Sequence, residues 1–244
     1  SREHRQIYPQ PGWVEHDAQE IWANLLAVSR EVLSRNEARI AEIAGVSLTN
    51  QRETIVAFDR RTGIPLHPAI VWQCRRGNAL CAEQVSRGRE TAIRARTGLR
   101  VDSYFSASKM QWLVRERPDL ATRLRDGRAA LGTIDAYLVH RLTGGEVFAT
   151  DSTNASRTLL FNLSRLAWDE ELCDWWEVPR RALPEVRESS ASFGTTILLG
   201  FVVGVGICGQ TFYGFVVENL RHLGALKAMG ASDRRIILRH LLPN

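Results

Sequence analysis

Cysteine is scarce in this sequence, and the few cysteines present follow no metal-binding or redox spacing. The 244 residues contain four cysteines, and no two of them form a CxxC pair. A zinc ribbon or a thioredoxin-like redox motif is therefore not indicated. We interpret Cys74, Cys81, Cys173 and Cys208 as buried free thiols, which suits a reducing cytosol. A metal site or a disulfide remains the alternative.

A large excess of one charge is missing as well. The net charge is +5. Residues 197–244 hold five basic and two acidic residues and so contribute +3, which leaves +2 for residues 1–196. Acidic and basic residues nearly balance in residues 1–196, so this part of the chain is not suited to hold nucleic acid by charge alone. We therefore expect no nucleic-acid partner. Residues 1–20 are polar and lack the apolar segment of a signal peptide.

What is present in residues 1–196 is the pattern of an α/β protein. Asp17 to Glu20 resembles a capping box, and apolar residues recur behind it at helical spacing. Residues 40–48 have the composition of a buried strand. Residues 54–58 are predicted to be its hairpin partner, with a turn after them.

Two helices are predicted in the middle of the chain. One covers residues 74–85, which would place Cys74 and Cys81, seven positions apart, on one face. The other covers residues 106–117 and ends before Pro118. Residues 129–134 then predict a strand that runs directly into a helix over residues 135–142.

That last helix should end at the adjacent glycines of Thr143-Gly144-Gly145, because glycine readily adopts the left-handed conformation at a helix end. Strands that alternate with helices in this way predict a mixed or parallel sheet.

The tail has a different composition. Residues 197–217 carry no charge over a length that a helix needs to cross a bilayer. We therefore predict a transmembrane helix there, with a buried core helix as the alternative. Gly200 and Gly204 form a small-xxx-small pair that would let another helix approach closely. A basic, amphipathic segment follows this span.

A polar run between two predicted strands is the first candidate for a binding site. Arg52 and Glu53 lie side by side in the string NQRET, where the backbone has to turn. An arginine donates hydrogen bonds and a carboxylate accepts them, so the two together match vicinal hydroxyl groups, which do both. An ordinary exposed ion pair, contributing about 0–1 kcal/mol, is the alternative for this pair taken alone.

Two aromatic residues extend this candidate site. Trp72 ends the apolar run AIVW, and Tyr104 immediately precedes a predicted helix. The tyrosine hydroxyl could bond a polyol while the ring covers its carbon chain. Packing in the core is the alternative for both residues.

Several strings follow one another as in glycerol kinases of the FGGY carbohydrate kinase family. They are QIYPQPGWVEHD, LTNQRET, AIVWQCRR, TGLRVDSYFSASKMQWL, GTIDAYLVHRLTGG, TDSTNASRTLLFN and LPEVRESSASFG. Residues 104–113 fit the first signature of that family, and the resemblance covers nearly all of residues 5–195. It implies an α/β fold, namely an incomplete actin-like (ribonuclease-H-like) ATPase lobe with a mixed sheet flanked by helices. It also implies that Arg52, Glu53 and Tyr104 hold glycerol, with Trp72 packed against it.

The resemblance further implies ATP-dependent phosphorylation of glycerol to glycerol 3-phosphate, with ATP and Mg as cofactors. The family's phosphate loop and the segment with its catalytic aspartate do not occur in residues 1–196, so we expect this chain to be inactive and name no catalytic residue. Asp102, Asp135 and Asp151 fall at structural positions of the family pattern. Another FGGY sugar kinase, for xylulose or gluconate, is the alternative, and NQRET with VWQCRR favours glycerol.

The tail resembles a different family, the FtsX-like ABC exporter permeases, in the string LRHLGALKAMGAS. The sequence therefore predicts two parts, a kinase lobe over residues 1–196 and a membrane segment over residues 197–244. A non-catalytic fusion or an artefact of assembly stays open as an alternative. Kinase resemblance implies a cytoplasmic homo-oligomer, whereas the excess of basic residues after the span favours a C-terminus in the cytoplasm and a body outside it.

Overall fold

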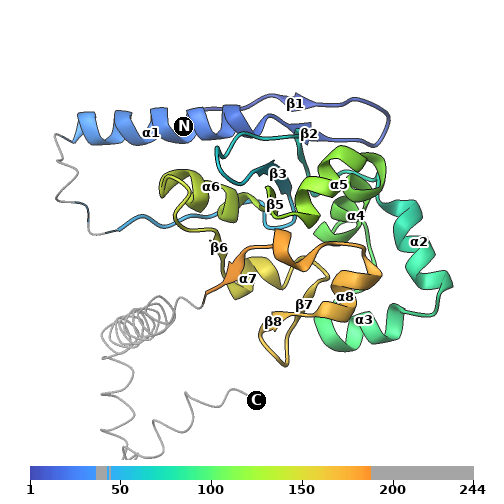
Figure 1. Cartoon of the computed structure of the whole chain (residues 1–244). Helices are drawn as coiled ribbons and strands as arrows, with labels where there is room; N and C mark the ends of the chain where they lie inside the picture. The colour runs from blue at the N-terminus through green and yellow to red at the C-terminus, as the bar shows by residue number, and fades with distance from the viewer. Residues whose placement is uncertain (37–42, 44, 188–244) are drawn as a thin grey trace, which may run out of the picture. The chain divides into compact units, whose positions relative to one another are not determined.

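The computed structural model describes residues 1–36, 43 and 45–187 of the chain (Figure 1). The predicted transmembrane span, the permease-like tail and Cys208 lie outside these residues. Within the described ranges, no helix is both long enough and apolar enough to cross a membrane.

The described chain mixes strands and helices, as the sequence predicted, but the alternation is interrupted by successive helices over residues 78–125. In chain order they are β1 (Gln6–Ile7), β2 (Glu15–His16), α1 (Ala18–Arg35), β3 (Ile55–Asp59), β4 (Ala69–Ile70), α2 (Asn78–Ser86), α3 (Glu90–Thr97), α4 (Ser106–Glu116), α5 (Pro118–Arg125), β5 (Ala129–Thr133), α6 (Ile134–Leu142), β6 (Ala149–Thr150), α7 (Ser152–Ala155), β7 (Phe161–Asn162), β8 (Ala167–Trp168), α8 (Glu170–Trp175), the 3-10 turn η2 (Arg180–Ala182) and β9 (Glu185–Val186).

The main sheet has five strands in the order β1-β2-β4-β3-β5, and its pairings are antiparallel. β3 and β5 form its longest pairing, since all five residues of β3 are paired with β5, from Ile55 opposite Thr133 to Asp59 opposite Ala129. A parallel pairing joins β6 to β9 in a separate two-stranded sheet. The fold thus combines parallel and antiparallel pairing with flanking helices.

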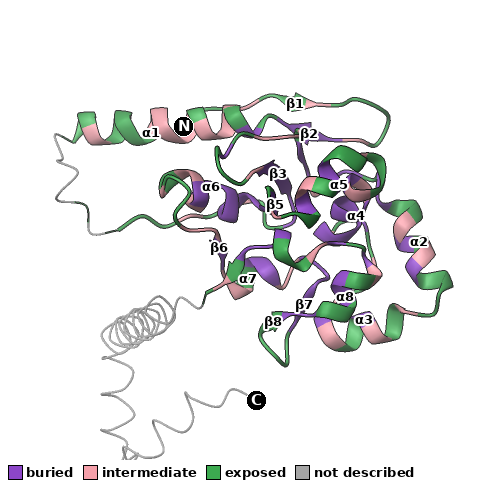
Figure 2. Ribbon diagram, viewed as in Figure 1, coloured by how far each residue is buried: buried purple, intermediate pink, exposed green. Residues whose placement is uncertain are grey.

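Alternation along β3 creates one hydrophobic core on each face of the sheet, because successive side chains of a strand point to opposite faces. Ile55 and Ala57 pack in the core that contains residues of α4 and α5. Val56 and Phe58 pack in the second core, with residues of α1 and α6. Figure 1 shows α4 and α5 on one side of β3 and β5 and α6 on the other, and Figure 2 shows β3 and β5 buried.

Most of the predicted helices are confirmed. α4 ends just before Pro118, and β5 runs directly into α6. The amide of Gly145 donates to the carbonyl of His140, which closes the end of α6. Asp17 caps α1 by accepting from the amide of Gln19, although Glu20 accepts from the amide of Arg5 instead of completing a capping box.

One predicted helix starts later than expected. α2 begins at Asn78 rather than at residue 74, because the chain turns first, with the amide of Cys74 bonded to the carbonyl of Val71. Cys74 therefore does not share a helix with Cys81. Both thiols and that of Cys173 are nevertheless free and buried, as predicted.

The strand predicted over residues 40–48 is wrong in its described part. Residues 45–48 form no strand, and the side chain of Val46 is 76% exposed. The reason lies in β3, the predicted hairpin partner. Its two edges are already paired, with β5 on one side and with Ile70 of β4 on the other, so no edge is left for residues 45–48.

Candidate functional site

The chain turns sharply just before β3 begins. The amide of Thr54 donates to the carbonyl of Gln51 at 3.2 Å, and the Thr54 hydroxyl donates to the Gln51 side chain at 2.9 Å. This turn gives the neighbours Arg52 and Glu53 different surroundings. Arg52 is exposed, whereas Glu53 is only 5% exposed.

A second arginine supplies the partner of the buried carboxylate. Arg157 donates from Nε to Glu53 Oε1 at 2.7 Å. Its guanidinium lies 4.9 Å from the centre of the Phe105 ring and 5.8 Å from that of Tyr104. Sequence reasoning missed Arg157 as a site residue, although it lies within the string TDSTNASRTLLFN, two residues after the end of α7.

The two predicted aromatic residues do meet. The ring centres of Trp72 and Tyr104 are 5.2 Å apart with the planes tilted by 59°. The backbone of Trp72 is fixed to the turn before β3, because its amide donates to the Thr54 hydroxyl at 3.2 Å. Tyr104 is 37% exposed, so its ring is reachable from solvent.

The beginning of α4 holds the segments of this site together. Ser106 donates from its buried hydroxyl to the carbonyl of Glu53 at 3.1 Å. The amide of Ala107 donates to the carbonyl of Thr158 at 2.9 Å, next to Arg157. We call the group Glu53, Trp72, Tyr104 and Arg157 the carboxylate–aromatic site. Three of the four predicted residues belong to it, and Arg52 lies beside Glu53 but on the exposed side of the turn.

This arrangement suits a small neutral ligand that both donates and accepts hydrogen bonds. A buried carboxylate is an acceptor, a guanidinium is a donor, and tilted aromatic rings offer an apolar wall. Vicinal hydroxyl groups on a short carbon chain match that combination.

Three aspartates could have acted as a general base, but each of them accepts hydrogen bonds from neighbouring groups of the chain. Asp151 caps α7 and accepts from the amide of Asn154 at 2.9 Å. Burial raises the pKa of Asp151, but the hydrogen bonds from Thr153 and Asn154 outweigh it and lower that pKa below its ordinary value. Asp102 accepts from the amide of Tyr104 at 2.7 Å.

Asp135 is the most buried of the three. It accepts from the hydroxyl of Thr150 at 2.6 Å, and burial raises the pKa of its carboxyl above the ordinary value. No cluster of three or more His, Cys, Asp or Glu side chains that could hold a metal ion occurs in residues 1–36, 43 and 45–187.

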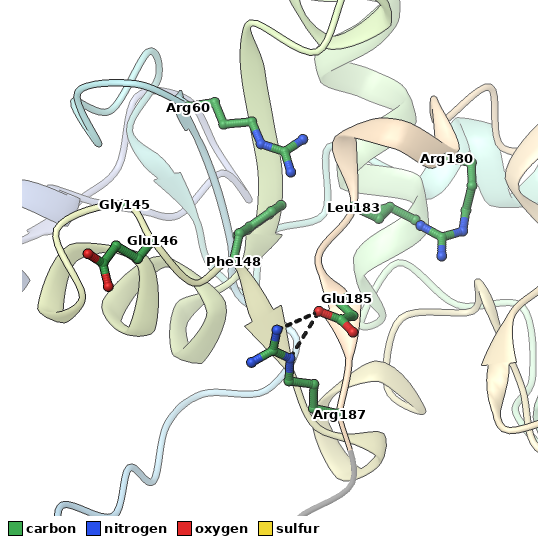
Figure 3. A pocket seen from close by; sticks show the side chains of 8 residues that line it. All are labelled: Arg60, Gly145, Glu146, Phe148, Arg180, Leu183, Glu185 and Arg187. Carbon is green, nitrogen blue, oxygen red and sulfur yellow. Dashed lines mark hydrogen bonds and ion pairs between the residues drawn. The ribbon is translucent and has the colours of Figure 1, made fainter.

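A separate cavity of about 370 Å³ opens near the end of the described chain (Figure 3). Three arginines, Arg60, Arg180 and Arg187, line it together with Phe148, and Arg187 is paired with Glu185 at 2.8 Å. This cavity shares no lining residue with the carboxylate–aromatic site.

Comparison with known proteins places the chain in a family. The FGGY family of carbohydrate kinases, N-terminal domain, matches residues 1–211. The glycerol kinase of Symbiobacterium thermophilum is 48% identical over 248 residues, which covers 97% of this chain and 50% of that protein. The chain spans about half the length, or less, of the curated relatives it matches.

Solved structures agree with this match. The crystal structure of Plasmodium falciparum glycerol kinase with ADP has a TM-score of 0.73 and 38% sequence identity, covering 76% of this chain and 37% of that one. The gluconate kinase of Lactobacillus acidophilus, with a TM-score of 0.65, 23% identity, and coverage of 77% and 36%, shares the fold. The described residues thus form the actin-like lobe, and the chain belongs to the FGGY family of carbohydrate kinases.

Proposed function

We propose that this chain supplies the glycerol-binding lobe of an ATP-dependent glycerol kinase. The observation that carries the proposal is the buried carboxylate of Glu53, placed beside Arg157 and the ring pair of Trp72 and Tyr104. In this proposal Glu53 accepts from one hydroxyl group, Arg52 donates to another from the rim, and Trp72 and Tyr104 cover the carbon chain.

The choice of glycerol over a sugar rests on similarity. Curated relatives between 47% and 51% identical are named glycerol kinase. Solved gluconate and xylulose kinases that share the fold are only 23–24% identical. The higher identity supports glycerol as the substrate, with ATP as the phosphate donor and Mg as its metal. Cytoplasmic location and a homo-oligomer are part of the same proposal.

Glycerol binding can be tested directly with the 244-residue chain. We expect glycerol to shift the NMR signals of a ¹³C-tyrosine-labelled chain at Tyr104, and we expect Glu53→Ala to abolish that shift. Glu116→Ala is the matched control, since Glu116 is exposed and lies at the far end of α4. Equal shifts in the wild type and Glu53→Ala would remove Glu53 from the site.

We further propose that the chain transfers no phosphate by itself. Phosphoryl transfer requires a positioned donor and a base near the acceptor hydroxyl, and orientation of glycerol alone gives no reaction. Support comes from the occupied carboxylates of Asp102, Asp135 and Asp151. An assay with ATP, magnesium and glycerol should give no glycerol 3-phosphate. Product that disappears in Glu53→Ala would contradict this proposal.

The tail offers a second, non-catalytic role as a membrane anchor of ABC permease type. Its support is the uncharged composition of residues 197–217, which lie outside the described part of the chain. Carbonate extraction of membranes from cells that express the full chain is the test. Retention in the pellet is the expected result, and complete release would exclude a transmembrane helix.

A further inference from the structure

Lys109 is a fully buried lysine in the second turn of α4, and it sits directly beneath the loop that carries Tyr104. The residue is 0% exposed. Its Nζ donates to the carbonyl of Tyr104 at 2.8 Å, to that of Phe105 at 2.9 Å, and to that of Ser103. An ammonium group has three N–H donors, so all of them are used on three consecutive carbonyls.

Burial of a charged group is unfavourable unless hydrogen bonds or opposite charges compensate for it. The compensation here comes mainly from the backbone of residues 103–105, whose three carbonyls all accept from one atom, Lys109 Nζ. The amide of Tyr104 is fixed as well, because it donates to Asp102 Oδ1 at 2.7 Å. Both polar groups of the Tyr104 backbone are therefore anchored, and only the side-chain torsions remain to be set.

The first turn of α4 is closely packed. Gly77 packs against α4 so closely that a Cβ atom added to it would lie 2.3 Å from Ser108 Oγ. Ser106, Ala107 and Ser108, which precede the lysine, are each 0% exposed. The loss of the ammonium would leave the three carbonyls of residues 103–105 without their donor.

We propose that Lys109 is a positioning residue of the carboxylate–aromatic site, whose protonated amine fixes the backbone at Tyr104 and so holds the Tyr104 ring against Trp72. The inference rests on the proposed function only in taking Tyr104 as a contact of glycerol. The positioning of the ring is a property of the chain that can be measured without any ligand.

The charge state of Lys109 makes this role depend on pH. Burial lowers the pKa of Lys109 to about 8, against smaller raising effects that include those of Glu53 and Asp102, and the thiols of Cys74 and Cys81 face it as well. Burial also raises the pKa of the Cys81 thiol to about 11, so that thiol stays neutral near pH 8. A neutral amine has two N–H donors, so one of the three carbonyls loses its partner when the lysine loses its proton.

The test uses the full chain labelled with ¹³C-tyrosine, in which the Tyr104 signal is assigned by Tyr104→Phe. Lys109→Met keeps the apolar stem and removes the three donors. We expect the Tyr104 signal to move toward the position of a solvated tyrosine while the signal of Tyr137, which is 0% exposed in the other core, stays in place. Glycerol affinity should fall at least about tenfold.

Gln84→Met is the matched control. Gln84 is also 0% exposed and donates to a backbone carbonyl, that of Trp175 at 2.8 Å, while its side-chain oxygen accepts from Arg89 rather than from residues 103–105. This variant should leave the Tyr104 signal unchanged. A Tyr104 signal that is equally unchanged in Lys109→Met would overturn the inference.

A pH titration supplies a second readout that a merely structural lysine would not give. Between about pH 6.5 and about pH 9, below the ordinary ionisation of tyrosine, the wild-type Tyr104 signal should change with a midpoint near pH 8, and Lys109→Met should lack this transition. If Lys109→Met fails to fold, which the loss of the Tyr137 signal would reveal, the wild-type titration decides alone, and a flat curve refutes the inference. A wild type that shows the transition but never binds glycerol would refute the proposed function and leave the positioning role standing.

Discussion

Glu53 and Arg157, 104 positions apart in the sequence, form a hydrogen-bonded ion pair of 2.7 Å at the start of β3. The glutamate side chain is 6% exposed and the arginine side chain 27% exposed, so the pair is buried on its acidic side. The arginine next to Glu53 in sequence is instead exposed. The carboxylate–aromatic site is therefore assembled by tertiary contacts.

Removing the cationic partner of this pair should destabilise the chain. Arg157→Met leaves the buried Glu53 carboxylate without its charged donor, and we expect a loss of about 1–3 kcal/mol in the free energy of unfolding. Glu53→Gln combined with Arg157→Met should recover part of that loss, because no buried charge then remains. Urea denaturation of the single and double variants measures the coupling, and strictly additive effects would contradict a direct pair.

Among the arginines of the described residues, Arg76 should give the largest loss in the free energy of unfolding when it is replaced. Its side chain is 0% exposed, lies 4.0 Å from the Trp13 ring and 4.5 Å from the Trp112 ring, and donates to Glu15. Arg76→Met should cost about 3–5 kcal/mol, since the partner charge remains buried without compensation.

Arg76→Lys should also be destabilising, because an ammonium lacks the planar guanidinium that lies close to both the Trp13 and the Trp112 ring. The control is Arg75→Met, the exposed neighbour, which should change stability by less than about 0.5 kcal/mol. Urea unfolding midpoints test this order, and equal effects at positions 75 and 76 would refute it.

His16 should make stability depend on pH in the acidic range. Burial lowers the pKa of His16 to about 4, with a smaller lowering effect from His4 and an opposing one from Glu20. The unfolded chain protonates this histidine near pH 6.5, so between about pH 6.5 and about pH 4 the unfolded state binds more protons. Stability is therefore lost as the pH falls through this window. His16→Gln should flatten that part of the curve, measured by unfolding between pH 4.5 and 7.5, and an unchanged slope would exclude His16 as its source.

The buried thiols should react slowly in the native chain. Burial raises the pKa of Cys81 to about 11 and that of Cys173 to about 12, so almost no thiolate is present near neutral pH. In a Cys208→Ser background, a thiol-specific chromogenic reagent should react with the three remaining cysteines only after addition of urea. Rapid reaction of the folded protein would show that at least one of these thiols is accessible.

Local sequence signals were sufficient for several elements, and they singled out three of the side chains that form the carboxylate–aromatic site. Pro118 cannot continue a helix, and α4 ends before it. The apolar run before Asp135 continues directly into a helical pattern, and β5 and α6 follow one another in that way. Glu53, Trp72 and Tyr104 were identified from short strings that each lie within a few residues, and the structure brings these three together.

Tertiary structure alone decided which strands pair and which arginine meets the carboxylate. Residues 45–48 have a strand-like composition, yet β3 pairs with β5 and β4, because a strand has two edges and the best partners come from distant parts of the chain. Arg52 and Arg157 are alike as sequence letters, and only the turn at Gln51–Thr54 and the position of α7 place the second one against Glu53. The sequence determined the residue types that the site requires. Their mutual distances depend on loop closure and packing across the whole lobe, which no local pattern contains.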